Sequence, residues 1–355
     1  MKATGEKDLR TRREFLTEFA FGSAAAIAGG RLAGAVARAQ PATNWKAQIG
    51  LELYTVRDLL ANDYEGILEK VAAIGYKEVE PAGGYNSMSP QQYRAMLDRL
   101  GLTMPSTHAP ARGTGAELEK QLEGFQIMGI KYTEIANGAG AAAARGARAG
   151  RGAAPPLAPG AYFDAGTGII HNAFTEVEAF GPYQPPVTLE SVKERAAQLN
   201  ANGKIARKFG MKMLVHNHTG EFERLRDSAR TTYDVLLAET DPSLVTMQLD
   251  LGWTYIAGVD PVALFKQYPG RFELWHIKDV FGLKTVNSSL GPNARVSSMA
   301  LVPVGTGHID FKPAFAHATL AGLKHFLVEQ DNAAAWGDSL AATRVSYLNM
   351  VRILS

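Results

Sequence analysis

The feature that most constrains the fold is a regular alternation of short apolar runs and amphipathic helical patterns. Eight apolar runs have the length of buried strands; they span residues 49–54, 76–80, 102–108, 130–136, 211–216, 244–250, 272–277 and 323–329. Helical patterns separate them, at residues 64–74, 90–100, 116–128, 189–209, 232–239, 261–268 and 311–320, with a last one at 339–354. Eight strand–helix units in about 300 residues predict an α/β fold, a (β/α)8 TIM barrel that forms a single domain over residues 45–355.

Local signals mark the ends of these helices. Ser89-Pro90 and Asp260-Pro261 each place a capping side chain before a proline at the first helical position. A doubly wound open sheet is the competing α/β architecture, and it normally carries a glycine-rich phosphate loop after an early strand. The turn after the first run, LELYTVRD, contains no glycine. The sequence therefore favours the closed barrel.

Residues 138–160 interrupt this pattern. The segment reads GAGAAAARGARAGRGAAPPLAPG and is built from only five residue types, without apolar periodicity. Such a composition does not bury a packed core. We expect a tolerated insertion on the face of the barrel where the fourth strand ends, and the alternative is a lid whose arginines meet an acidic ligand.

The N-terminus has the pattern of an export signal. Arg12 and Arg13 form a twin-arginine pair, an Ala/Gly-rich stretch follows, and Ala37-Arg38-Ala39 fits an A-x-A cleavage site. We predict a twin-arginine signal peptide over residues 1–39, the twin-arginine export machinery as a partner, and a periplasmic or secreted mature protein. The apolar stretch is too short and too interrupted for a stable membrane span.

Charge and cysteine content exclude several classes of protein. Residues 1–39 hold seven Lys/Arg and four Asp/Glu, and the remaining chain is nearly neutral, with 30 basic and 31 acidic residues. A neutral body provides no electrostatic attraction for nucleic acid or an anionic membrane. The chain has no cysteine, which excludes a disulfide framework, a thiolate zinc site and a Cys nucleophile. The sequence leaves self-association into a homo-oligomer open.

Ionisable and aromatic side chains gather where the predicted strands end. In a TIM barrel these ends converge on one pocket. The residues at the ends are Glu52, Glu80, His108, Glu134, His216, His218, Asp250, Trp253, His276, Lys278, Asp279, Glu329 and Asp331. Buried charges are costly unless they are paired or bind a metal. For Asp279 and Asp331 we expect the simpler role of helix caps.

Asp250, His276 and Glu329 together indicate a metal site. Carboxylates and imidazoles without a thiolate suit one divalent ion, which could be Mn, Zn, Co, Fe or Mg. The fourth ligand stays open from the residues alone, because His216, Glu221 and Glu223 all lie near the end of the fifth strand.

The ordered set of strand-end motifs resembles the xylose isomerase-like TIM barrels of the sugar phosphate isomerase/epimerase superfamily. The matching pieces are LELYTVRD, AAIGYKEVE, HNHTGEFE, LDLGW, YPGRFELWHIKDV, VGTGHIDF and VEQD. The resemblance implies one divalent metal held by His216, Asp250, His276 and Glu329. Sugar epimerases of this superfamily have a glutamate where His216 stands, so the HNH form is closer to the branch of inosose dehydratases and enzymes that cleave 3-keto-glycosides. Thr306 also departs from an acidic residue common in relatives.

The resemblance implies proton abstraction next to a carbonyl, leading to isomerisation, epimerisation or elimination. A bound metal stabilises the resulting enediolate, and a positioned base takes the proton. We expect His218 or His108 to be this base, with Glu329 as a second catalytic group. Substrate contacts are expected from Glu52, Glu80, Trp253 and Lys278.

An exported enzyme is expected to act on an unphosphorylated sugar, keto-sugar or 3-keto-glycoside. Two rival interpretations remain. One is a non-catalytic periplasmic sugar-binding or accessory barrel, against which the many charges in the pocket argue. The other is an endonuclease-IV-like nuclease, which needs three zinc ions and a histidine where this chain has Trp253.

Overall fold

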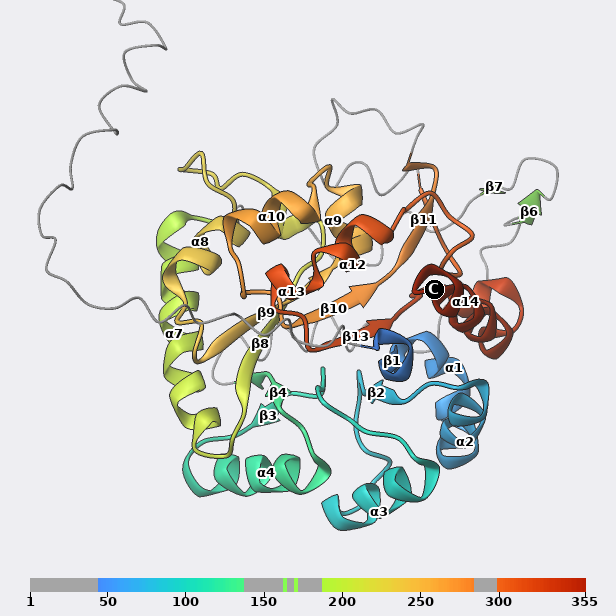
Figure 1. Ribbon diagram of the computed structural model, residues 1–355. Coiled ribbons are helices and arrows are strands. Elements are labelled where there is room, and N and C mark those ends of the chain that lie inside the picture. Colours follow the sequence, from blue (N-terminus) through green and yellow to red (C-terminus); the bar gives the residue numbers. More distant parts are fainter. Residues whose placement is uncertain (1–43, 137–161, 165–168, 172–186, 284–298) are drawn as a thin grey trace, which may run out of the picture. The chain divides into compact units, whose positions relative to one another are not determined.

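Seven short parallel strands form the central sheet of this protein, in the order β2-β1-β13-β10-β9-β8-β4 (Figure 1). The computed structural model describes residues 44–136, 162–164, 169–171, 187–283 and 299–355. The strands are β1 (Ile49–Glu52), β2 (Glu78–Glu80), β4 (Tyr132–Thr133), β8 (Lys212–His216), β9 (Val245–Asp250), β10 (Leu274–Ile277) and β13 (His325–Val328). Each lies within a run that the sequence predicts to be a strand.

The sheet closes through the segment that contains the predicted third strand. Parallel bridges join Glu78 to Thr103 and Ser106 to Tyr132, so this segment connects β2 to β4. The prediction of a regular strand at residues 102–108 is wrong, however, because the segment forms only these isolated bridges. Pro105 lies in its middle and has no N–H to donate to a ladder, although its carbonyl accepts hydrogen bonds from Lys131 and Tyr132. The eight-membered TIM barrel itself is confirmed.

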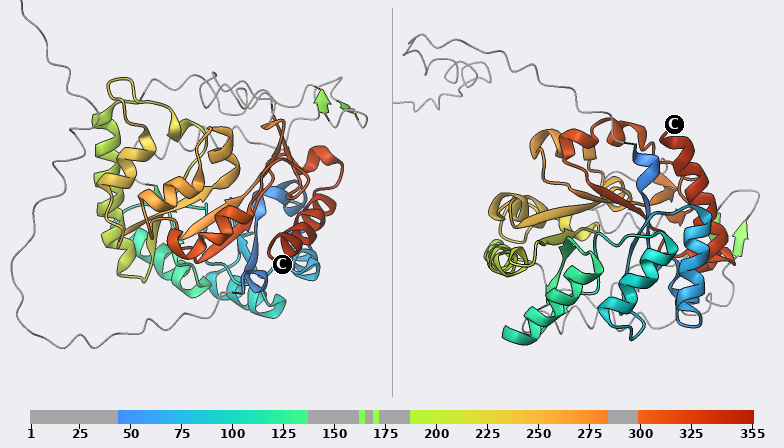
Figure 2. Two further views of the ribbon diagram at one scale, coloured as in Figure 1. Left: turned by 45° about the horizontal axis from the view of Figure 1, so that its top comes forward. Right: turned by 60° about the horizontal axis from the view of Figure 1, so that its bottom comes forward.

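Helices surround the strands (Figures 1 and 2). The longer ones are α2 (Tyr64–Ile74), α3 (Pro90–Leu100), α4 (Gly115–Met128), α7 (Leu189–Arg207), α8 (Thr232–Glu239), α10 (Pro261–Gln267) and α14 (Ser339–Ile353). The predicted capping signals are used: Ser89 forms a capping box with Gln92, and the Asp260 side chain accepts a hydrogen bond from the backbone N of Val262. Such caps satisfy N–H groups that have no partner within the helix.

The sequence did not predict the short elements around the barrel. The predicted helix at residues 311–320 is split at His317 into α12 (Lys312–Ala316) and α13 (Ala318–Ala321). Additional helices are α1 (Arg57–Leu60), α9 (Leu251–Ile256) and the 3-10 turns η1 (Trp45–Gln48), η2 (Leu53–Val56), η3 (Gly220–Phe222) and η6 (Ala333–Trp336). Three two-stranded pairs join β3 (Ala111–Arg112) to β5 (Ile135–Ala136), β6 (Tyr162–Asp164) to β7 (Ile169–His171) and β11 (Asp279–Phe281) to β12 (Ala300–Val302).

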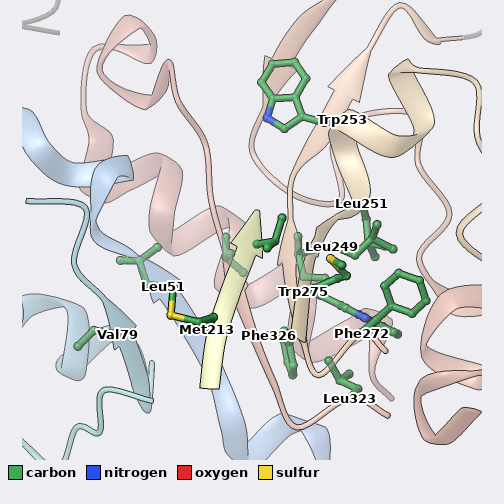
Figure 3. Close-up of a cluster of buried hydrophobic side chains, with 14 of the residues drawn as sticks. Leu51, Val79, Met213, Leu249, Leu251, Trp253, Phe272, Trp275, Leu323 and Phe326 are labelled. Atoms are coloured by element: carbon green, nitrogen blue, oxygen red, sulfur yellow. The ribbon is translucent and has the colours of Figure 1, made fainter. Parts of the chain in front are cut away.

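The main apolar core lies between the strands and the helices. Figure 3 shows members of this layer, among them Trp275 and Phe326. The Trp275 ring stacks on Phe265 of α10, with ring centroids 5.0 Å apart, and Phe326 meets Phe315 of α12 at 5.1 Å. Because successive strand residues alternate between faces, the residues next to Trp275 and Phe326 in each strand point into the barrel, and at the carboxyl ends these are polar.

Gly50 of β1 is required by close packing inside the barrel. A Cβ atom at this position would lie 2.9 Å from the Phe326 carbonyl oxygen and 3.1 Å from Glu78 Cβ. Replacing Gly50 by Val should therefore lower the free energy of unfolding by about 1–3 kcal/mol, the usual cost of overpacking. Urea unfolding would measure this loss. The control is Gly83→Ala, where the added Cβ has no atom within 4 Å; an equal effect in both variants would contradict the packing argument.

Two predicted segments lie outside the described residues, namely the signal peptide at 1–39 and the insertion at 138–160. Within the part of the chain that the structure describes, no helix is both long enough and apolar enough to span a bilayer.

Candidate metal centre and active site

Four side chains predicted to bind a metal meet at the carboxyl ends of adjacent strands. His216 ends β8, Asp250 ends β9, His276 lies in β10 and Glu329 follows β13. One potential ligand atom from each of these residues lies within 4.8 Å of the others. The strand register explains this meeting, because His276 is the direct neighbour of Asp250 in the sheet and each side chain points into the barrel.

The facing atoms of this group have the arrangement of a ligand set. His276 Nδ1 and Glu329 Oε2 are 2.7 Å apart, yet neither has an aligned hydrogen bond among the described residues. Asp250 uses Oδ1 to cap α9, accepting from the Trp253 backbone N at 2.9 Å. Its Oδ2 has no hydrogen-bond partner in the described part of the chain and lies 3.9 Å from His216 Nε2. Buried polar atoms normally have such partners. Two imidazoles and two carboxylates directed at one point fit a divalent cation.

Glu80 lies behind this group and connects two histidines. Its Oε1 is 2.9 Å from His276 Nε2 and 2.9 Å from His108 Nε2, and Gln248 Nε2 donates to the same carboxylate at 2.8–2.9 Å. Burial acts to raise the pKa of Glu80, but the two neighbouring histidines outweigh it and hold the pKa well below the ordinary value. A carboxylate bound to the far nitrogen of a metal-binding histidine fixes the ring orientation and the tautomer.

The protonation of the two candidate histidine ligands is set by their surroundings. Burial, together with the neighbouring His276 and His218, holds the pKa of His216 well below its ordinary value. Burial also opposes a charge on His276, but Glu329 and Glu80 outweigh it and raise the pKa of His276 to about 10. His216 is therefore neutral at pH 7, and His276 carries a proton that a metal would displace.

Lys278 brings a positive charge to the same place. Its fully buried ammonium group lies 3.3 Å from Asp250 Oδ2, 3.2 Å from Glu329 Oε2 and 2.5 Å from Asp331 Oδ2. Burial alone would lower the pKa of Lys278, but these carboxylates raise it well above its ordinary value. The substrate contact of Lys278 stays a prediction; in the structure its ammonium group contacts these carboxylates and the ring of Trp253. Asp331 pairs with this ammonium group, which differs from its expected role as a helix cap.

A cavity of about 610 Å³ opens above these residues. Among the residues that line it are Glu52, His108, His216, His218, His276 and Glu329. Burial and the nearby Glu80 raise the pKa of Glu52 well above its ordinary value, so Glu52 can present a neutral carboxyl that donates a hydrogen bond to a substrate oxygen. Both histidines expected to act as the base line this cavity, but the ring nitrogens of His108 already have partners, with Nδ1 3.2 Å from Glu134 Oε1 and Nε2 2.7 Å from Gln248 Oε1.

Two residues expected to contact substrate lie elsewhere. Glu80 is fully buried and makes its contacts within the protein, so its placement fits a positioning role for His108 and His276. Trp253 is 1% exposed in the core, with Lys278 Nζ 4.7 Å from its ring centroid. Neither residue lines the cavity among the residues described.

The region after β8 bears on the fourth ligand. Glu221 lies in the turn η3, and its Oε2 accepts a hydrogen bond from the backbone N of His218, just before that turn, at 2.8 Å. His216, in contrast, belongs to the four-residue group described above. The geometry therefore favours His216 as the fourth ligand over Glu221 and Glu223, neither of which belongs to such a group.

The sequence did not predict Gln248 as a site residue, nor the residues after β1 and β2 that line the cavity. It also predicted a different role for Asp279. Gln248 could have been found, because it precedes Asp250 by two positions and so shares its face of β9. Asp279 does not cap a helix: it accepts hydrogen bonds from the backbone N atoms of Gly305 and Gly307 at 2.8 and 2.9 Å, which fixes the loop before α12.

Comparison with known proteins supports this assignment of the fold. The family model described as the xylose isomerase-like TIM barrel matches residues 68–345. The inosose dehydratase of Lacticaseibacillus casei is 25% identical over 294 residues, covering 81% of this chain and 89% of that protein. That of Clostridium tetani is 32% identical over 137 residues, covering 37% of this chain and 44% of its own length.

Solved structures show the same fold at low sequence identity. A sugar phosphate isomerase/epimerase from Parabacteroides distasonis has a TM-score of 0.58 and 19% identity, covering 90% of this chain and 98% of that one. An IolI protein with a bound zinc atom has a TM-score of 0.55 and 12% identity, covering 87% of this chain and 98% of that one.

Proposed function

The chain belongs to the xylose isomerase-like TIM barrel family, and from that premise we propose that it is a metal-dependent enzyme that removes a proton next to the carbonyl of a sugar. The observation that carries this proposal is the convergence of ligand atoms from His216, Asp250, His276 and Glu329 within 4.8 Å of one another. Relatives that are inosose dehydratases support a sugar-modifying reaction of this kind.

The proposed cation is one of Mn, Zn, Co, Fe or Mg, held by these four residues. When bound, it supplies Lewis-acid stabilisation of the negative charge that develops on a carbonyl oxygen after deprotonation. Glu80 keeps a proton on His276 Nε2 and so leaves Nδ1 for the metal side. Of the two predicted bases at the cavity, His218 takes the proton from carbon. His108 is less suited to this role, because Glu134 and Glu80 lie 3.2 and 2.9 Å from its two ring nitrogens and these carboxylates outweigh burial and raise its pKa well above the ordinary value.

The reaction after deprotonation is isomerisation, epimerisation or elimination, since the first step is common to all three. We propose an unphosphorylated sugar, keto-sugar or 3-keto-glycoside as the substrate, because Arg12 and Arg13 indicate export of the mature protein and sugar phosphates are mainly cytoplasmic. Turnover of a sugar phosphate, with none of any neutral sugar or glycoside, would refute the substrate class.

Solvent exchange tests the proposed chemistry directly. The purified, metal-loaded protein is incubated in D2O with a panel of keto-sugars and 3-keto-glycosides, and deuterium at carbon is followed by NMR. We expect deuterium to enter next to the carbonyl, because the proton removed by the base equilibrates with solvent. No exchange and no product with any member of the panel, in protein with one metal per chain, would favour the non-catalytic sugar-binding barrel.

Metal binding should release about one proton per ion at pH 7.5. His276 has a pKa of about 10, so it is protonated there and must lose a proton to bind a cation, whereas neutral His216 loses none. Apparent affinity should consequently rise with pH up to about 10. Calorimetric metal titrations in buffers of different ionisation enthalpy measure the number of protons, and a value of zero would contradict His276 as a ligand. In the control variant His325→Gln, at the other end of the barrel, the number should not change.

A further inference from the structure

The cavity extends well beyond the candidate metal ligands. Those ligands come from β8, β9, β10 and the end of β13, whereas the far part of the lining comes from the segments after β1 and β2. We call this far part the side arm; it is formed by Tyr54, Arg57, Leu60, Tyr64, Tyr85 and the loop of residues 82–87.

The cavity is larger than a single sugar ring requires. A six-carbon sugar has about twelve non-hydrogen atoms, and at no more than about 30 Å³ each, the share of one molecule in liquid water, it takes up less than about 360 Å³. The cavity of about 610 Å³ therefore leaves room for a second group attached to a ring that lies at the metal end.

Three tyrosines, Tyr54, Tyr64 and Tyr85, contribute to the lining of the side arm. The Arg57 guanidinium carbon lies 3.8 Å from the centroid of the Tyr54 ring, and its Nη1 donates to the Tyr54 carbonyl oxygen at 2.7 Å. Tyr64 hydrogen-bonds Tyr93 through the two hydroxyl groups at 2.8 Å. Aromatic rings with a polar edge are the usual means by which proteins bind a ring that has one apolar face and polar substituents.

The loop of the side arm is held in a fixed and costly conformation. Asn86 and Ser87 have φ values of 50° and 57°, a region that residues other than glycine seldom adopt, and such conformations cluster at functional sites. The preceding Tyr85 is fixed by a 2.8 Å hydrogen bond to Thr107 Oγ1, and its ring packs edge-on against Phe125. The side arm is thus preformed, and it is tied to the site because Thr107 precedes His108.

From these observations we propose that the side arm binds a second ring, either a sugar or an aryl group, joined to the sugar that reacts at the metal end. The enzyme then prefers glycosides to free monosaccharides. This inference rests on the proposed function, because it places the reacting sugar beside His216, His276 and Glu329.

Binding of unreactive glycosides tests the side arm without requiring catalysis. Matched methyl, phenyl and β-glucosyl glycosides of glucose, galactose and xylose are titrated by calorimetry into metal-loaded and chelator-treated protein. In at least one sugar series we expect a phenyl or glucosyl glycoside to bind about tenfold more tightly than the methyl glycoside. The phenyl and glucosyl arms distinguish an aryl ligand from a second sugar.

Variants of the side arm should remove this preference. Tyr54→Ala deletes a ring surface, and Leu60→Trp fills the space, so each should reduce the ratio of two-ring to one-ring affinity to about one. The control is Tyr268→Ala, a half-buried tyrosine at the end of α10, which should keep the ratio of the unmodified protein. The Leu60→Trp variant retains Tyr54, so a folding defect of Tyr54→Ala does not remove the test.

If methyl and two-ring glycosides bind with equal affinity in every sugar series, the proposal that the side arm binds a second ring is wrong. A series in which none of the glycosides binds counts as one of equal affinity. An unchanged preference in both Tyr54→Ala and Leu60→Trp would also overturn the proposal. These results can be told apart from a failure of the proposed function. If deuterium enters a free keto-sugar while no glycoside preference is found, the proposed function is supported and only the side-arm proposal is wrong. Ring preference in chelator-treated protein supports the side arm even where no exchange is found.

Discussion

Replacing Asp250 by Asn should lower turnover about a thousandfold and reduce bound metal to a small fraction of one ion per chain. The thousandfold loss corresponds to about 4 kcal/mol of transition-state stabilisation, as expected when the negative charge of a metal ligand is removed. The fold should survive, because Asn retains an oxygen that can cap α9 at the Trp253 backbone N. Steady-state kinetics, metal analysis and circular dichroism measure the three effects.

Asp260→Asn is the matched control for this change. Asp260 also caps a helix, accepting from the Val262 backbone N at 2.9 Å, but it is remote from the cavity. We expect Asp260→Asn to keep the metal and the turnover of the unmodified protein. Full activity and full metal content in Asp250→Asn would show that Asp250 is not a metal ligand.

Replacing Glu80 by Gln should have the largest effect on stability. Glu80 is fully buried between His108 and His276, and removal of one partner from a buried charged group costs about 3 kcal/mol or more. Its pKa is lowered in the folded state, so its contribution to stability is present above its unfolded pKa of about 4.3 and is lost as pH falls through the folded value. Urea unfolding from pH 7 down to pH 3 should therefore show a deficit at pH 7 that shrinks at acidic pH.

Glu78→Gln provides the comparison. Glu78 lies two residues earlier in the same strand and also pairs with a histidine, His325, at 2.9 Å, but this pair is more exposed than the Glu80 pairs. A smaller loss of stability is expected there, with metal affinity unchanged. If Glu80→Gln were no less stable than Glu78→Gln at pH 7, the connecting role of Glu80 would be wrong.

The sequence predicted the barrel because each strand and its following helix carry their own signals. Apolar runs, prolines at helix starts and the polar residue at each strand end are all local. Because parallel strands of a barrel bring these ends to one face, it was sufficient to identify Asp250 and His276 as strand-end residues to predict that they meet.

The parts that the sequence missed depend on contacts between distant residues. Glu80 contacts His276, which is 196 residues away in the sequence. The periodicity of apolar residues cannot predict this contact, and so it cannot predict that Glu80 is buried away from the cavity. The sequence predicts Trp253 in the pocket because it follows a strand, but α9 begins immediately after Asp250 and the Trp253 ring is buried in the core. The side arm depends on the backbone of Asn86 and Ser87. Asparagine tolerates a positive φ better than most residues, but the residue types do not show that this loop lines the cavity.

Locating a bound metal in crystals of the protein would test the proposed site most directly. We predict that anomalous scattering from crystals of protein purified with Mn or Zn shows one ion per chain, coordinated by His216, Asp250, His276 and Glu329. A protein that takes up no stoichiometric ion would contradict it. So would an ion bound elsewhere while Asp250 and Glu329 stay paired with Lys278.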